Sequence, residues 1–125
     1  MRLLIDTHAL IWWLTANSRL SQAAEAAITD PLNQLYASAC AGYEIMYKQQ
    51  LRRLPPIPGN LPDSLRRDRI MLLPISLDHA IAAAVLPGPH RDPWDRIMMA
   101  QAKIEALTVL TIDQVFATYR IPTLW

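Results

Sequence analysis

Short apolar runs alternate along this chain with longer segments in which apolar residues recur every three or four positions. The short runs are rich in Leu, Ile, Val, Thr and Tyr, a composition typical of buried β-strands. We expect strands over residues 3–5, 34–38, 71–75, 108–111 and, as an edge strand, 121–125.

The longer segments predict helices between these strands, over residues 8–14, 21–29, 40–51, 63–69, 76–86, 94–106 and 114–119. A proline-rich stretch over residues 55–62 predicts a loop and not a domain boundary, since neither flank is able to form a core alone. Because strands that alternate with helices form parallel sheets, we expect a single α/β domain over residues 1–125. Its central, mostly parallel sheet should be flanked by helices on both faces.

Composition narrows the class of protein further. The chain has 125 residues, of which 52% are hydrophobic and 18% are charged, and its formal net charge is +1. These values exclude intrinsic disorder and a protein that coats polyanions. The lone cysteine, Cys40, excludes an internal disulfide and a cysteine-based zinc site. Asp6 follows Met1 too closely for a signal peptide, and no apolar run reaches the roughly 18 residues of a membrane span. We therefore expect a soluble, cytoplasmic protein without a membrane partner.

Two acidic residues follow predicted strands. Asp6 comes directly after the first strand, and Asp113 lies just beyond the strand over residues 108–111. Both should project from the carboxyl edge of a parallel sheet, where open α/β folds bind their ligands. The alternative is structural, because Asp before a helix is also a favoured N-cap.

Two further acids stand on predicted helices. Glu44 is surrounded by apolar and aromatic residues, and the structural alternative is an ion pair with Lys48 one turn later. In the segment 90–96, Pro93 favours a helix start and sets Asp92 and Asp95 within one turn of each other. The structural alternative there is that Asp92 caps the helix and Asp95 occupies its first turn.

Carboxylates that converge from separate segments repel one another unless a cation lies between them. Oxygen ligands without cysteine favour Mg²⁺ or Mn²⁺ over zinc. Such ions accept phosphate oxygens and activate water for attack on phosphorus. The four acids Asp6, Glu44, Asp95 and Asp113 therefore indicate hydrolysis of phosphodiester bonds.

Several motifs in this order resemble the PIN-domain ribonucleases, and specifically the VapC toxins of bacterial toxin-antitoxin pairs. The resemblance spans the whole chain and implies a PIN-like three-layer fold. The motifs are Leu3-Leu4-Ile5-Asp6-Thr7-His8-Ala9-Leu10 with Trp12-Trp13, Tyr43-Glu44-Ile45 with Lys48, His79-Ala80 with Leu86-Pro87, His90-Arg91-Asp92-Pro93-Trp94-Asp95-Arg96, Ala100-Gln101-Ala102, Thr111-Ile112-Asp113 and Tyr119-Arg120-Ile121-Pro122.

The resemblance implies a metal site formed by Asp6, Glu44, Asp95 and Asp113, with Asp92 as an accessory acid. It also implies an endoribonuclease that requires Mg²⁺ or Mn²⁺ and forms a homodimer. A cognate VapB-type antitoxin would inhibit it by occupying the active-site groove. Among the acids, we expect Asp6 and Asp95 to be direct metal ligands, while Glu44 and Asp113 complete a second site or orient water.

The chain departs from the family pattern at the helix that supplies Glu44. Gly42 and Tyr43 stand where the family has other residues, commonly Trp before the acid, and Ile112 replaces a polar or basic residue. Gly42 lowers helix stability by roughly 1 kcal/mol relative to Ala. These departures leave open a catalytically weak binding module that only engages an antitoxin or another protein. A phosphatase of the haloacid dehalogenase type is a second alternative, but it requires an Asp where this chain has His8.

Candidate substrate contacts lie beside the acids. Arg91 and Arg96 flank the predicted metal ligands and are suited to pair with a phosphate of RNA, although Arg96 has an ion pair with Asp92 as its alternative. Thr7 and Thr111 are further candidates. The basic residues between positions 48 and 69 are interpreted as a solvated surface or an RNA-facing rim, and His8, His79 and His90 as structural or rim residues.

Overall fold

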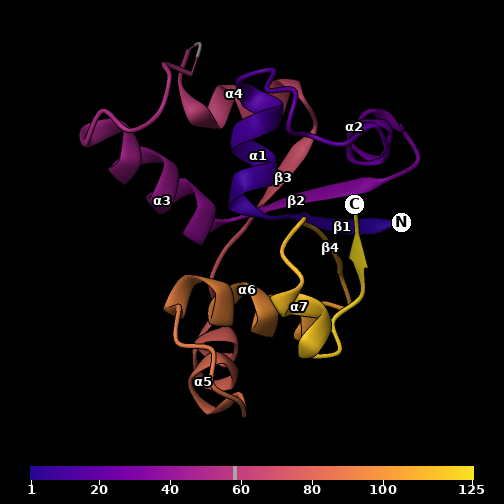
Figure 1. The fold of residues 1–125 in the computed structure, drawn as a ribbon, viewed down its shortest axis with the longest axis vertical. Coiled ribbons are helices and arrows are strands. Elements are labelled where there is room, and N and C mark those ends of the chain that lie inside the picture. Colours follow the sequence, from indigo (N-terminus) through magenta and orange to yellow (C-terminus); the bar gives the residue numbers. More distant parts are fainter. Residues whose placement is uncertain (58) are drawn as a thin grey trace.

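A five-stranded, all-parallel sheet lies at the centre of the computed structural model, which describes residues 1–57 and 59–125 (Figure 1). The strand order is β3-β2-β1-β4-β5. The strands are β1 (Arg2–Ile5), β2 (Gln34–Ser38), β3 (Ile70–Leu73), β4 (Thr108–Leu110) and β5 (Thr123–Leu124). All five correspond to predicted strands, and the predicted α/β class is confirmed.

Helices cover both faces of the sheet. They are α1 (Thr7–Leu14), α2 (Gln22–Thr29), α3 (Ala39–Gln50), α4 (Leu61–Arg67), α5 (Leu77–Val85), α6 (Pro93–Ile104) and α7 (Val115–Thr118). In Figure 1, α1 to α4 lie on one side of the sheet and α5 to α7 on the other. None of the described helices combines the length and the apolar character that crossing a membrane requires.

The core forms two layers because side chains of a strand point alternately to opposite faces. Leu3 and Ile5 of β1 belong to the cluster beneath α1 to α4, whereas Leu4 belongs to the cluster with α6 and α7. All three side chains are fully buried, as expected for a central strand with helices on both faces.

The largest difference from the predicted boundaries is at α4. The helix begins at Leu61, not residue 63, because the Asn60 side chain accepts a hydrogen bond from the Asp63 amide at 2.9 Å. It ends at Arg67 because Arg69 adopts a positive φ of 57°, and β3 begins at the next residue. The predicted proline-rich loop includes Pro58, which lies outside the described residues.

Helix α5 packs against α6 and forms an outer tier at the end of the molecule away from α1 to α4 (Figure 1). Arg96 of α6 fastens the two helices together. Its Nε, Nη1 and Nη2 atoms donate to the carbonyl oxygens of Ala83, His90 and Leu86 at 3.1, 3.0 and 2.6 Å. The end of α5 and the connection to α6 are thereby held to the first turn of α6.

Candidate active site

The carboxyl ends of β2, β1 and β4 lie side by side, because these three strands are neighbours in the sheet. Asp6 follows β1, Asp113 follows β4, and Ser38 ends β2 and caps α3. This adjacency places the N-termini of α1 and α3 at the same edge as the loop that carries Asp113. The edge is therefore the candidate site, as the sequence predicted for Asp6 and Asp113.

Asp6 is buried, with 5% of its surface exposed. Its Oδ1 accepts a hydrogen bond from the Thr7 amide at 2.8 Å, so it is the N-cap of α1. Its Oδ2 accepts from the Thr111 hydroxyl at 2.8 Å, and the Thr111 oxygen in turn accepts from the Asp113 amide at 2.9 Å. Thr111 thus connects the Asp6 carboxylate to the loop of Asp113.

Burial raises the pKa of Asp6 above its ordinary value, and the nearby charge of Asp113 raises it further. The hydrogen bonds from Thr111 and Thr7 and the charge of His8 act in the opposite direction without cancelling the effect of burial. A carboxylate that is desolvated and also repelled by a second acid is typical of a functional site.

Asp95 is in the first turn of α6, where Asp92 is the N-cap and Pro93 the first residue. Burial raises the pKa of Asp95, and the negative charges of Asp92 and Asp6 add to this effect. The charge of Asp6 therefore acts on Asp95, although the two residues come from separate segments of the chain. The helix-capping interpretation of Asp92 is also correct, since its Oδ1 accepts from the amides of Trp94 and Asp95.

A contact between His90 and Asp95 was not foreseen from the sequence. The Nε2 atom of His90 lies 2.9 Å from Oδ2 of Asp95, across five positions of the chain. That spacing does not match a helical turn, and the contact depends on how the segment before α6 folds back. The available signal was the density of prolines at 87, 89 and 93, which restricts that segment.

Glu44 lies in α3 and forms the ion pair with Lys48 that was its structural alternative to a metal-site role, with Nζ and Oε2 2.9 Å apart. Cys40, on the same helix, is buried, and burial raises the pKa of its thiol. The charges of Glu44 and Asp92 raise that pKa further, so both carboxylates lie near Cys40 from different helices. Tyr43 contacts Trp94 with ring centroids 5.0 Å apart and joins α3 to the start of α6.

The donor set suits Mg²⁺ or Mn²⁺ in its chemistry. All four acids offer oxygen ligands, and a divalent cation would relieve the burial and repulsion that raise the pKa of Asp6 and Asp95. Within residues 1–57 and 59–125, no three His, Cys, Asp or Glu side chains yet converge as a metal-binding group. Two of the acids instead face basic partners, Glu44 with Lys48 and Asp95 with His90. Binding of a cation would therefore compete with these two contacts.

The candidate substrate residues differ in accessibility. Arg91 is exposed beside Asp92, whereas the Arg96 guanidinium donates to the carbonyls of Ala83, His90 and Leu86 and forms no described ion pair with the Asp92 carboxylate. Thr7 and Thr111 are each 3% exposed, and the Thr111 hydroxyl is already bonded to Asp6. The geometry thus gives Arg96 and Thr111 contacts within the protein.

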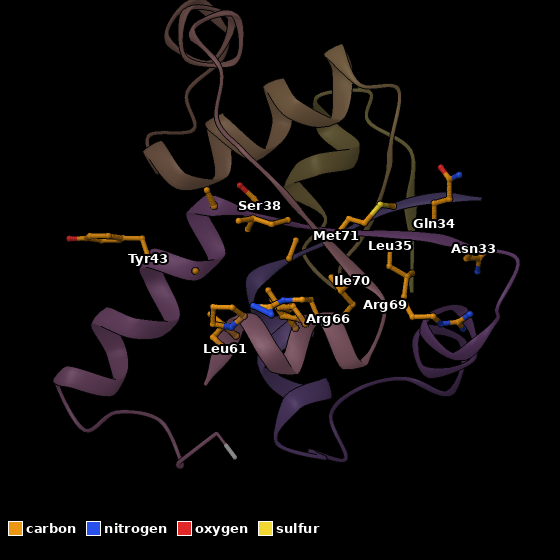
Figure 2. A pocket seen from close by; sticks show the side chains of 17 residues that line it. Asn33, Gln34, Leu35, Ser38, Tyr43, Leu61, Arg66, Arg69, Ile70 and Met71 are labelled. Carbon is orange, nitrogen blue, oxygen red and sulfur yellow. The ribbon is translucent and has the colours of Figure 1, made fainter. Parts of the chain in front are cut away.

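A cavity of about 850 Å³ opens between α3, α4, β2 and β3 (Figure 2). Its lining is mostly apolar, with Leu35, Leu65 and Ile70 among the residues, and Arg66 and Arg69 also line it. None of the four acids lines this cavity. It is a feature separate from the carboxylate site.

Fold and site together define a three-layer α/β protein with acidic side chains gathered at the carboxyl edge of its parallel sheet. The model of the PIN domain family matches residues 3–122, and the chain belongs to this family. A comparison with curated proteins finds no match.

Solved structures with a similar fold include toxin-antitoxin complexes. VapBC2 from Rickettsia felis, bound to a promoter DNA fragment, has a TM-score of 0.69 at 12% identity, covering 99% of this chain and 98% of that one. A toxin-antitoxin complex from Klebsiella pneumoniae has a TM-score of 0.69 at 20% identity, covering 98% and 96%. FitAcB from Neisseria gonorrhoeae has a TM-score of 0.66 at 21% identity, covering 98% and 96%. The similarity extends over nearly the full length of each chain and concerns the fold.

Proposed function

We propose that this protein is a VapC-type toxin: an endoribonuclease that uses Mg²⁺ or Mn²⁺, acts in the cytoplasm as a homodimer and is inhibited by a VapB-type antitoxin. The observation that carries the proposal is a pair of carboxylates from separate segments, Asp6 and Asp95, whose pKa values burial raises, with the charge of Asp6 raising the pKa of Asp95 further. A fold has little reason to keep such a pair unless a cation joins it. The similar structure from Klebsiella pneumoniae is a toxin-antitoxin complex, which supports an antitoxin as partner.

In this mechanism Asp6 and Asp95 would hold the metal, and Glu44 and Asp113 would complete a second site or orient water, with Asp92 as an accessory acid. When bound, the ion supplies Lewis acidity toward the phosphate and lowers the pKa of a water ligand. Asp6 suits the role of direct ligand because two hydrogen bonds fix its carboxylate before any ligand arrives.

Arg91 and Arg96 have different proposed roles in binding the RNA substrate. Arg91 is exposed next to Asp92, so its guanidinium is free to pair with an RNA phosphate. Arg96 holds the segment that carries Arg91 through its bonds to the Leu86 and His90 carbonyls. We assign phosphate binding to Arg91 and support of that segment to Arg96.

The test is cleavage of structured RNAs, including total tRNA, by protein freed of antitoxin, first with Mg²⁺ or Mn²⁺ and then with EDTA. Asp6→Asn and Asp95→Asn should abolish cleavage, whereas Glu25→Gln, an exposed acid on α2, should retain it. Full cleavage by Asp6→Asn, or cleavage that persists in EDTA, would refute the proposed function.

One observation favours a second candidate, a binding module with little or no catalysis. Glu44 and Asp95 are already paired with Lys48 and His90, as expected if no metal is used. Titration with Mn²⁺, followed by electron paramagnetic resonance, separates the two. Absence of Mn²⁺ binding by the folded protein would favour the binding module, and binding that Asp6→Asn weakens would favour the nuclease.

A further inference from the structure

Three aromatic side chains form a column on the outer surface of α3 and the start of α6. The rings of Tyr43 and Tyr47 are stacked, with an interplanar angle of 8° and centroids 5.9 Å apart. Trp94, in the first turn of α6, has its ring centroid 5.0 Å from that of Tyr43. Tyr43 and Tyr47 are 56% and 53% exposed, and the Tyr43 ring extends from α3 away from the sheet (Figure 2). The two tyrosine rings are therefore held parallel to each other and are accessible from solvent.

The column begins at the candidate active site. Glu44 follows Tyr43 in the chain, and Trp94 comes two positions after Asp92, the N-cap of α6. The charges of Glu44 and Asp92 both raise the pKa of the Cys40 thiol, so these two carboxylates lie near each other. An RNA chain with one phosphate at the carboxylates therefore has its neighbouring nucleotides within reach of the rings.

Basic side chains follow the column along α3. Between residues 45 and 62 the sequence contains Lys48, Arg52 and Arg53 and no acidic residue. Lys48 is paired with Glu44, whereas the exposed side chains of Arg52 and Arg53 have no hydrogen bond or ion pair within the described part of the chain. Exposed aromatic rings beside such cations are suited to nucleic acid, because rings stack on bases and guanidinium groups bind phosphates.

The charges around the column favour RNA over a protein as its occupant. The centre of a protein interface is depleted in charged residues, whereas this column has carboxylates at one end and cations at the other. A protein partner would have to match both signs of charge. RNA meets both with one chemical group, since its phosphates would bind the metal held by the carboxylates and also pair with the arginines.

We propose that Trp94, Tyr43 and Tyr47 form a platform on which unpaired bases of the RNA stack, beside the phosphate that is cleaved. Bases within a double helix already stack on their neighbours, so the platform selects unpaired segments. Tyr47 is the outer member, since its one described ring contact is with Tyr43. The proposal rests on the proposed function for RNA as the ligand and adds the residues that bind its bases.

The test compares two ligands that differ only in their bases: an oligoadenylate and an abasic ribose-phosphate chain of the same length. Binding is measured by fluorescence anisotropy in EDTA, so that it does not depend on cleavage. The wild-type protein should bind the oligoadenylate more tightly by about 5- to 150-fold, the range expected for stacked bases. Tyr47→Leu should lose most of this preference, because Leu is apolar but has no ring. Tyr47→Phe retains the ring and should restore it.

Leu32→Ala is the matched control for the loss of an exposed apolar side chain. Leu32 is 85% exposed in the turn before β2, at the amino edge of the sheet and so opposite the carboxylates. This variant should bind both chains as the wild-type protein does. Because the altered side chains are exposed, the circular dichroism spectrum of each variant should match that of the wild type.

Equal affinity of the wild-type protein for the two chains would overturn the proposal. A Tyr47→Leu variant that keeps the preference would also overturn it, and a changed molar mass of that variant in sedimentation equilibrium would then assign the column to a protein contact. The outcome is separate from that of the cleavage assay. If cleavage fails but the base preference is present, the proposed function is refuted and the platform stands; cleavage without a base preference refutes the platform alone.

Discussion

Replacing Thr111 with Val should destabilise the protein, because it removes the Thr111 hydroxyl group and the two hydrogen bonds that this group forms. Val has nearly the same shape as Thr, so the substitution removes the donor to Asp6 and the acceptor for the Asp113 amide with little change in packing. Thr111→Ser is the matched control, because it keeps the hydroxyl and removes only a methyl group.

The magnitude follows from the burial of the two partners. A hydrogen bond to a charged group contributes about 1.5–3 kcal/mol. With Asp6 at 5% and Thr111 at 3% exposure, water does not replace the lost donor, whereas the exposed Asp113 regains a water partner for its amide. We therefore expect the free energy of unfolding at pH 7 to fall by about 2 kcal/mol. For a chain of this length, that loss lowers the melting temperature by about 6–10 °C.

The pH dependence of this loss is the sharper part of the prediction. The Thr111 hydrogen bond lowers the pKa of Asp6, so its removal raises that pKa further. The stability difference between Val and wild type should be largest where Asp6 is ionised and should shrink as the pH falls through the folded-state pKa of Asp6. Urea unfolding of the metal-free protein across this pH range measures it. Equal stability of the Val and Ser variants at pH 7, or a loss that does not vary with pH, would refute the role given to Thr111.

Three further predictions concern residues of α3 and α6. Folding raises the pKa values of Asp6 and Asp95, so the protonated forms of both residues stabilise the folded protein. This stabilisation is fully present below the unfolded pKa of about 3.9 and is lost as the pH rises through the folded pKa. Asp95→Asn should therefore raise the melting temperature of the metal-free protein at pH 7, and a decrease would contradict this explanation. Arg96→Lys should accelerate amide hydrogen exchange over residues 86–92, because one ammonium group cannot replace three separate guanidinium donors. Unchanged exchange would show that Arg96 does not stabilise this segment. Gly42→Ala should stabilise α3 by up to about 1 kcal/mol in thermal unfolding, because the new Cβ meets no atom within 4 Å, and a loss of stability would show that Gly42 has a packing role.

The fold was largely predictable because its signals are local. The apolar runs and the capping residues are properties of short segments, and the predicted elements match the observed ones closely except at α4. The left-handed conformation of Arg69 ends α4 two residues before the predicted end, and nothing in the composition of residues 61–70 marks it. The order β3-β2-β1-β4-β5 was also not predicted, since strand order depends on contacts between distant segments.

The part of the site that follows directly from strand position was predictable from the sequence. Residues after adjacent parallel strands meet at one edge, and this rule is sufficient for Asp6 and Asp113. The contact of His90 with Asp95 and the three carbonyl partners of Arg96 depend on the path of the segment between α5 and α6. That path results from packing of α5 against α6, which periodicity alone does not specify.

The partners of the four acids show how the chain folds around a repulsive cluster before any cation is bound. Asp6 is stabilised by hydrogen-bond donors of the protein itself, whereas Glu44 and Asp95 face side chains that carry or accept a proton. Hydrogen bonds leave the second lone pair of each Asp6 oxygen available, so Asp6 needs no rearrangement to become a ligand. Glu44 and Asp95 would have to share or release a basic partner. Preorganisation is therefore greater at Asp6 than at Glu44 or Asp95, and this difference is the physical reason to expect Asp6 to contribute more than either of them to metal affinity.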